Sequence, residues 1–211
     1  MMVGELEGRP VAVSAGSGYD DATLRVWDLT TGDPIGEPIV AHPVGVVTMA
    51  LGEVDGRPVV VTGGYDDAIR IWDLTTRALV GEPIRLSNTE RVDAVAVGEV
   101  NGRAVAVTGS VDGTTRIWDL ATRKQMGDPM VSGTGVGEVA LGRVDGRQVA
   151  VSSDDENMRV WDSTTHQLIG VPIPTGLTYG VRTVVVGEVN GRPVVLAGGG
   201  DDEDGGGAVQ V

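Results

Sequence analysis

The chain has 211 residues, of which 41% are hydrophobic and only 3% aromatic, with no Phe and no Cys. A formal net charge of −14 argues against nucleic acid or an anionic membrane as partner, because both select clustered Lys and Arg. Without cysteine, disulfides and thiolate chemistry are excluded. The first residues show neither a basic flank nor a long apolar run, so the sequence predicts a cytoplasmic protein without a secretory leader.

A two-residue turn followed by Arg is the first feature that recurs along the chain. Asp-Gly or Asn-Gly between apolar segments predicts a tight β-hairpin, because both central residues of such a turn need a positive φ. In the first copy Glu replaces Asp or Asn. The copies are Glu7-Gly8-Arg9, Asp55-Gly56-Arg57, Asn101-Gly102-Arg103, Asp145-Gly146-Arg147 and Asn190-Gly191-Arg192.

Apolar segments flank each hairpin, as at 46–54 and 58–62. An Asp-rich turn follows, then a segment that ends in Trp-Asp, then a Thr-rich turn and a fourth short run such as 79–84. Pro83 in that run removes a backbone N–H, which predicts an edge strand. Each unit is therefore predicted to be a four-stranded antiparallel meander, and no helix is expected.

The Trp-Asp segment sets the period of the chain. Each of the four tryptophans is followed by Asp and preceded two places back by Arg, and the spacings are 45, 46 and 43 residues. Such a period is typical of repeat architectures. The tryptophans are Trp27, Trp72, Trp118 and Trp161.

Four strands per period, with Trp-Asp closing the third strand, resembles the WD-repeat β-propeller family. The resemblance covers essentially the whole chain and implies an all-β fold with one blade per unit. It predicts a single propeller domain or propeller fragment, an incomplete ring of about four and a half blades. The expected blades are about 1–41, 42–86, 87–131, 132–175 and a partial 176–211.

The resemblance also implies a polar tetrad that braces each blade: Ser or Thr ten residues before the Trp, Asp six before it, the Trp, and a His before the innermost strand. One loop is three residues longer and another one residue shorter than this spacing. The His is present once, and Asn88, Ser132 and Leu177 stand at the matching later positions. The expected sets are Ser14, Asp21 and Trp27; His42, Thr62, Asp66 and Trp72; Thr108, Asp112 and Trp118; and Ser152, Asp155 and Trp161.

The two ends of the repeat array do not complement each other. The first innermost strand is short, and 209–211 aligns with 24–26, so the fifth unit lacks its outer strand. An unclosed blade face exposes apolar surface that a domain normally buries. The hypotheses are therefore a piece of a longer propeller, a protomer whose ring is completed by a second copy, or a truncated reading frame without an independent role.

Candidate chemistry is sparse. His42 and His166 fall at different places in their units and do not predict a metal pair or a nucleophile–base arrangement. The carboxylate clusters recur in the same loop of successive units, where Asp serves as turn former and hydrogen-bond acceptor. The acidic loop 201–204 exceeds what a turn needs, so cation binding there is kept as an alternative.

The candidates for partner binding are residues that are expected to point away from the rim of the propeller and that differ between units. They are Tyr19, Tyr65, Arg91 and Arg182, of the residue types common at interface hot spots. The Arg two places before each Trp is periodic, so its side chain is assigned to the blade, with its stem packed on a neighbour.

The sequence thus predicts a non-enzymatic interaction scaffold or sensing module that binds a protein partner and needs no cofactor or metal. The alternative is a ligand- or metal-binding or hydrolytic propeller that uses its channel or the acidic loop 201–204.

Overall fold

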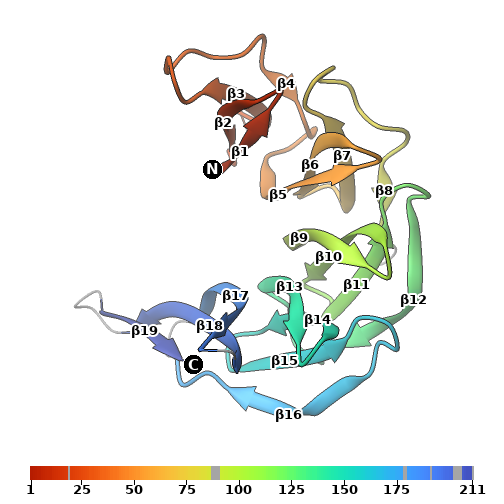
Figure 1. The fold of residues 1–211 in the computed structure, drawn as a ribbon, viewed down its shortest axis with the longest axis vertical. Coiled ribbons are helices and arrows are strands. Elements are labelled where there is room, and N and C mark those ends of the chain that lie inside the picture. Colours follow the sequence, from red (N-terminus) through yellow and green to blue (C-terminus); the bar gives the residue numbers. More distant parts are fainter. Residues whose placement is uncertain (19, 87–90, 178–179, 191, 202–205, 211) are drawn as a thin grey trace. The chain divides into compact units, whose positions relative to one another are not determined.

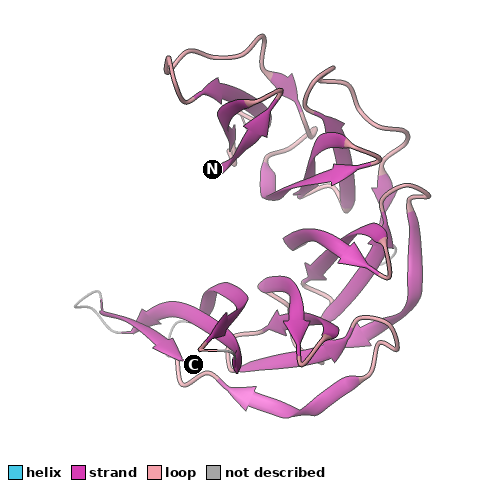
Figure 2. Cartoon of the chain, in the orientation of Figure 1, coloured by secondary structure: helices cyan, strands magenta, loops and turns pink. Residues whose placement is uncertain are grey.

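A computed structural model describes residues 1–18, 20–86, 91–177, 180–190, 192–201 and 206–210. The described residues form β-strands, turns and loops without a helix (Figure 2). The prediction of an all-β fold built from four-stranded antiparallel meanders is confirmed. The chain divides into two compact units, Met1–Val92 and Asp93–Val211.

The first unit contains two four-stranded sheets, which we call blades 1 and 2 (Figure 1). In each, neighbours in sequence are neighbours in the sheet, and the last strand is outermost. Blade 1 consists of β1 (Met2–Leu6), β2 (Arg9–Ala15), β3 (Thr23–Asp28) and β4 (Ile39–Val40). Blade 2 consists of β5 (Val46–Val54), β6 (Arg57–Gly64), β7 (Ala68–Asp73) and β8 (Ile84–Arg85).

The second unit contains blades 3 and 4, of four strands each, and blade 5, of three. Blade 3 consists of β9 (Val92–Val100), β10 (Arg103–Ser110), β11 (Thr114–Asp119) and β12 (Lys124–Val131). Blade 4 consists of β13 (Glu138–Val144), β14 (Arg147–Ser153), β15 (Asn157–Asp162) and β16 (Leu168–Pro174). Blade 5 consists of β17 (Val181–Val189), β18 (Arg192–Asp201) and β19 (Gly206–Gln210).

The hairpins between the first and second strands have the predicted geometry. Asp55 and Gly56 have φ of 50° and 75°, and Asn101 and Gly102 have φ of 51° and 75°. Glu7 adopts φ of 51° as well, so the departure from Asp or Asn does not change the turn. Because the turn fixes the register of the strands it joins, these pairs determine which side chains share a face of each blade.

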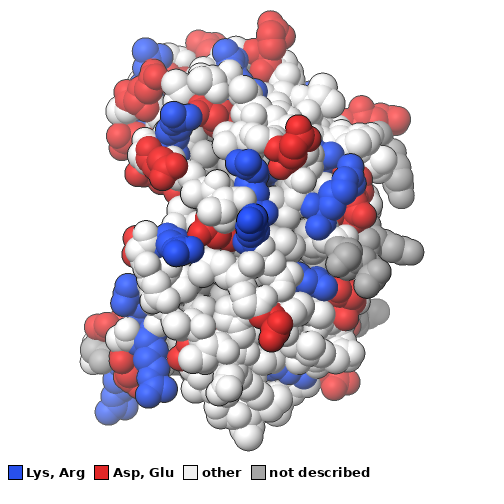
Figure 3. Space-filling view, turned by 90° about the vertical axis from the view of Figure 1, so that its right-hand side faces the viewer, with Lys and Arg blue, Asp and Glu red and all other residues white. Residues whose placement is uncertain are grey.

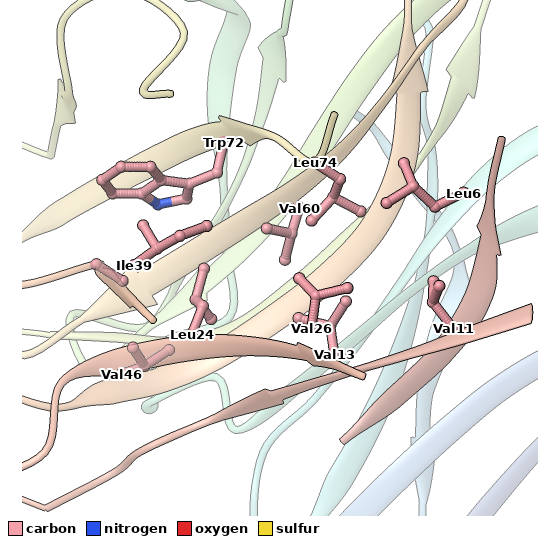
Figure 4. Packing of buried hydrophobic residues seen from close by; sticks show 11 residues of the cluster. Leu6, Val11, Val13, Leu24, Val26, Ile39, Val46, Val60, Trp72 and Leu74 are labelled. Carbon is pink, nitrogen blue, oxygen red and sulfur yellow. The ribbon is translucent and has the colours of Figure 1, made fainter. Parts of the chain in front are cut away.

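The core of the first unit lies between blades 1 and 2. Figure 4 shows Leu24 and Ile39 of blade 1 beside Val60 and Trp72 of blade 2, and Trp72 is 8% exposed. The remaining buried members of this cluster are Leu6, Val11, Val13, Val26, Ala41, Val46 and Leu74.

In the second unit, blade 4 is covered on both faces. One face packs on blade 3, where Trp161 contacts a cluster with Ile117 and Met130. The other packs on blade 5, where Ala140 and Val184 belong to one cluster. A strand buried on both faces requires a continuous apolar run rather than alternation, which explains the sequence of 149–151, three residues with no measurable exposure.

Candidate functional site

A hydrogen bond from the tryptophan indole to a hydroxyl spans the middle of each four-stranded blade. The tryptophan lies on the third strand and the hydroxyl on the second, and both are held by the antiparallel ladder between them. The bonds are Trp27 Nε1 to Ser14 Oγ (2.9 Å), Trp72 Nε1 to Thr62 Oγ1 (3.3 Å), Trp118 Nε1 to Thr108 Oγ1 (2.9 Å) and Trp161 Nε1 to Ser152 Oγ (2.8 Å).

Blade 2 extends this bond through a histidine. His42 Nε2 lies 2.9 Å from Thr62 Oγ1, and His42 Nδ1 lies 2.7 Å from Asp66 Oδ1. The threonine hydroxyl accepts from Trp72 Nε1, and Arg70 Nη1 lies 2.6 Å from the same His42 Nδ1. The four residues expected from the sequence therefore lie in one connected network.

Burial and charge act in opposite directions on this histidine. Burial lowers the pKa of His42, and the Arg70 guanidinium adds to that, whereas the Asp66 carboxylate raises it; the net shift is downward. Burial raises the pKa of Asp66, but the hydrogen bonds from Arg70 and His42 outweigh burial and hold it below its usual range. Near neutral pH the site therefore combines a neutral imidazole with an ionised carboxylate.

An arginine pairs with an aspartate in each of blades 1 to 4. Three of these pairs, in blades 2, 3 and 4, are largely shielded from solvent, so they are screened less than the exposed pair of blade 1. The pairs are Arg25–Asp21 (3.0 Å), Arg70–Asp66 (2.8 Å), Arg116–Asp112 (2.9 Å) and Arg159–Asp154 (2.5 Å).

The periodicity of these arginines predicted a place within the blade, but the ion pair was not predicted. The available signal was the spacing, because the aspartate precedes the arginine by four residues in three blades and by five in the fourth. The repeated arginine therefore contributes its guanidinium to each blade, and not only its aliphatic stem.

In blade 4 the predicted aspartate is corrected from Asp155 to Asp154. Asp154 Oδ2 accepts from Arg159 and from Thr134 Oγ1, the latter at 2.7 Å, and Asp154 Oδ1 accepts from the backbone N–H of Asn157. Asp155 is exposed. The loop is one residue shorter here, so the carboxylate that reaches the arginine comes from the first residue after β14.

The position matched to His42 also differs in the later blades. Ser132 in blade 4 is not the group that completes the network; Thr134, two residues further on, donates to Asp154 instead. In blade 5 the matching Leu177 is buried and apolar. Asn88 lies outside the described residues.

The aspartate of each Trp-Asp pair has a separate role. Asp73 Oδ1 accepts from the backbone N–H groups of Thr75 (2.9 Å) and Thr76 (2.8 Å), which closes the Thr-rich turn that follows. Asp162 does the same with Thr164 and Thr165, and these backbone hydrogen bonds lower its pKa. These carboxylates are committed to turns.

The candidate partner-binding residues are placed as follows. Tyr65 is 40% exposed, and the Arg91 guanidinium lies 5.8 Å from the centroid of its ring. Arg182 is exposed on β17. Tyr19 lies outside the described residues. The structure thus brings Tyr65 and Arg91 together at one cation–π contact and leaves Arg182 in the other unit.

The remaining candidates do not form a reaction centre. His166 Nδ1 lies 2.8 Å from the Asp128 carbonyl oxygen and joins a turn of blade 4 to β12 of blade 3. In the described ranges, no three His, Asp or Glu side chains gather as metal ligands would. The predicted cation site at 201–204 lies largely outside the described residues, with only the backbone of Asp201 inside them.

A shallow hollow of about 310 Å³ marks the seam between blades 3 and 4. Gln148 crosses it: its Nε2 donates to the Glu99 carbonyl oxygen at 3.0 Å, and its Oε1 accepts from the Asn101 N–H at 2.8 Å. The residues that line the hollow are polar and exposed, and the side-chain amide of Gln148 holds the two blades together.

On the face drawn in Figure 3, acidic and basic groups are interspersed.

Comparison with known proteins identifies the repeat. Residues 87–119, which end at Trp118-Asp119, match the WD domain, G-beta repeat family. This stretch is therefore similar to a WD repeat, and the predicted resemblance is confirmed. Members of this repeat family generally mediate protein interactions and are generally not catalytic.

The solved structures agree on the fold. The crystal structure of the computationally designed Ika4 protein, a designed propeller, is 22% identical and aligns with a TM-score of 0.62 over 83% of this chain and 98% of that one. In all, 1105 solved chains are significantly similar. No curated protein matches the sequence. In the described part of the chain, no helix has the length and hydrophobicity needed to cross a membrane.

Proposed function

We propose that this chain is a non-enzymatic interaction scaffold that binds a protein partner through its exposed blade loops. The WD repeat favours this role in general. Within the described residues, the His42 imidazole and the Asp66 and Asp154 carboxylates are bonded to other side chains inside the blades, and the Asp73 carboxylate is bonded to turn backbone. We retain the cytoplasmic location expected from the sequence.

The observation that carries the proposal is the contact between Tyr65 and Arg91. The tyrosine ring is 40% exposed and the guanidinium lies over it at 5.8 Å, which holds two long side chains in one geometry before any partner arrives. Tyr and Arg are the residue types that dominate interface hot spots, and preorganised side chains lose less entropy on binding. We place the partner on this pair.

The alternative, a ligand- or metal-binding or hydrolytic propeller, gains no support from the described residues. Its acidic loop lies mostly outside them, and Asp66 and Asp154, in the matching loops of blades 2 and 4, are already paired with Arg70 and Arg159.

Chemical cross-linking of the full chain in its host, followed by mass spectrometry, identifies the partner, and calorimetry then measures its affinity for variants. We expect Tyr65→Ala and Arg91→Ala each to weaken binding about 10- to 30-fold. Val171→Ala is the matched control, since Val171 is 76% exposed on the outer strand of blade 4. A partner that binds all three variants as it binds the parent protein would refute the assignment of Tyr65 and Arg91.

A further inference from the structure

Neighbouring blades within each unit meet through a repeated contact between their innermost strands. A glycine on one strand leaves a notch, and an aliphatic side chain of the next blade lies over it. A Cβ built at Gly4 would lie 3.0 Å from Leu51, at Gly98 3.1 Å from Leu141, and at Gly142 2.3 Å from Val186. A side chain at Gly142 would clash with Val186, and one at Gly4 or Gly98 would push the tip of the neighbouring leucine aside by a few tenths of an ångström.

Blade 5 carries the same notch, and it is empty. Gly187 stands at the corresponding position of β17, and a Cβ built there meets nothing within 4 Å. Val185 and Val189 flank it on the same face and are 53% and 48% exposed. Their counterparts on covered faces, Ala140 and Val100, are 8% and 0% exposed.

Blade 1 presents the matching side chain on its opposite face. Val3 occupies the position of Leu51, Leu141 and Val186 in the repeat and is 65% exposed. Trp27 on β3 shows the same lack of cover, being partly exposed where Trp161 is 6% exposed against blade 3.

We propose that a second copy of the chain docks its blade 1 on blade 5, with Val3 over Gly187 and Trp27 inside the contact. The same contact already joins consecutive blades three times, and one chain supplies both of its unused halves. Exposed apolar side chains clustered on a sheet face mark interaction surfaces, and tryptophan is the residue type most enriched at hot spots.

Charge agrees with this pairing. Glu5 lies two residues beyond Val3 on the same face of β1, and Arg192 pairs with Val189 and shares the face of the notch. Docking in the register of the internal contacts brings this carboxylate and this guanidinium to the same edge of the interface. The contact is heterologous, using different surfaces of the two copies, and is independent of Tyr65 and Arg91.

Sedimentation velocity with three variants tests the proposal. Val3→Asp blocks the blade 1 side, and Gly187→Leu fills the notch; both sites are open to solvent, so folding is preserved and circular dichroism checks it. At about 100 µM we expect the parent chain to associate and each variant alone to associate at least tenfold more weakly. Val171→Asp, on the outer strand of blade 4, is the control that leaves association unchanged.

Mixing the two blocked variants gives the sharper result. Each retains the half that the other lacks, so an equimolar mixture should form one-to-one dimers, which an association through any symmetric surface would not produce. A parent chain that stays monomeric at about 100 µM, variants that associate like the parent, or a mixture that stays monomeric would each overturn the proposal.

Discussion

Blades 2 and 4 complete the same kind of polar network with different residues. Both hold a tryptophan–hydroxyl bond and an arginine–carboxylate pair at the same places of their sheets. In blade 2 the carboxylate is reached by the His42 ring, and in blade 4 by the Thr134 hydroxyl.

The residue two places after the hydroxyl residue that bonds the tryptophan explains the difference. In blade 2 this is Gly64, where a Cβ would lie 2.2 Å from His42 Nδ1, so the ring occupies the space of a side chain. In blade 4 the corresponding residue is Asp154, whose own carboxylate fills that space, and a small hydroxyl suffices to contact it. What the repeat maintains is a complementary set of donors and acceptors, which different side chains can supply.

The largest effect is expected from Asp154→Ala. Asp154 is 6% exposed, and the loss of its carboxylate leaves the guanidinium of Arg159, which is largely shielded from solvent, without its partner, at a cost of about 3–5 kcal/mol. Urea unfolding measures this, and hydrogen exchange of the Trp161 indole N–H localises it to blade 4. Asp155→Ala, one residue on and exposed, should change the free energy of unfolding by less than about 0.5 kcal/mol. Equal effects of the two would contradict the conclusion that Asp154, and not Asp155, stabilises blade 4.

That pair of aspartates also shows how far sequence reasoning reaches. The hairpins were predictable because Asp-Gly and Asn-Gly select one backbone geometry, and the indole–hydroxyl bonds because strand register fixes their spacing. Asp154 was not, because counting back from the tryptophan ignores which carboxylate a shortened loop turns inward. Its Oδ1 accepts from the N–H groups of Glu156 and Asn157, a local turn that no spacing rule contains.

The arginine pairs were missed for a related reason. A periodic residue next to a core tryptophan is compatible both with a packed stem and with a buried charge, and only the three-dimensional distance from Arg116 to Asp112 decides between them. The exposed faces of Val3 and Val189 were unpredictable in detail, because burial depends on what covers a blade and not on its own pattern.

A second, smaller contrast concerns the innermost strands. Glu138 of blade 4 stands where blade 2 has Thr48, since each pairs with the residue after the tetrad hydroxyl. Burial raises the pKa of Glu138 from 4.5 to about 7. Because the folded-state pKa is the higher one, the stability this group contributes is complete below pH 4.5 and is lost as the pH rises through about 7.

Glu138→Gln removes that ionisation. At about pH 8 the variant should be more stable than the parent by about 2 kcal/mol, and at about pH 5 the two should differ little. The measurement is urea unfolding at both pH values, with Glu156→Gln, an exposed carboxylate of the same blade, as control. A gain that is the same at both pH values would show that packing, and not charge, is responsible.

The smallest effect is expected from a substitution of His42, the histidine of blade 2 that has no counterpart in blade 4. Burial lowers the pKa of His42 below the ordinary value of 6.5, so below that pH the unfolded chain binds more protons than the folded one. Stability should therefore fall as the pH drops from about 6.5, by at most about 1.4 kcal/mol per pH unit. His42→Gln should flatten this slope, measured by urea unfolding between about pH 7 and pH 5. His166→Gln, which removes the other histidine of the chain, should leave it intact; if the His166 variant flattens the slope instead, the network of blade 2 is not its source.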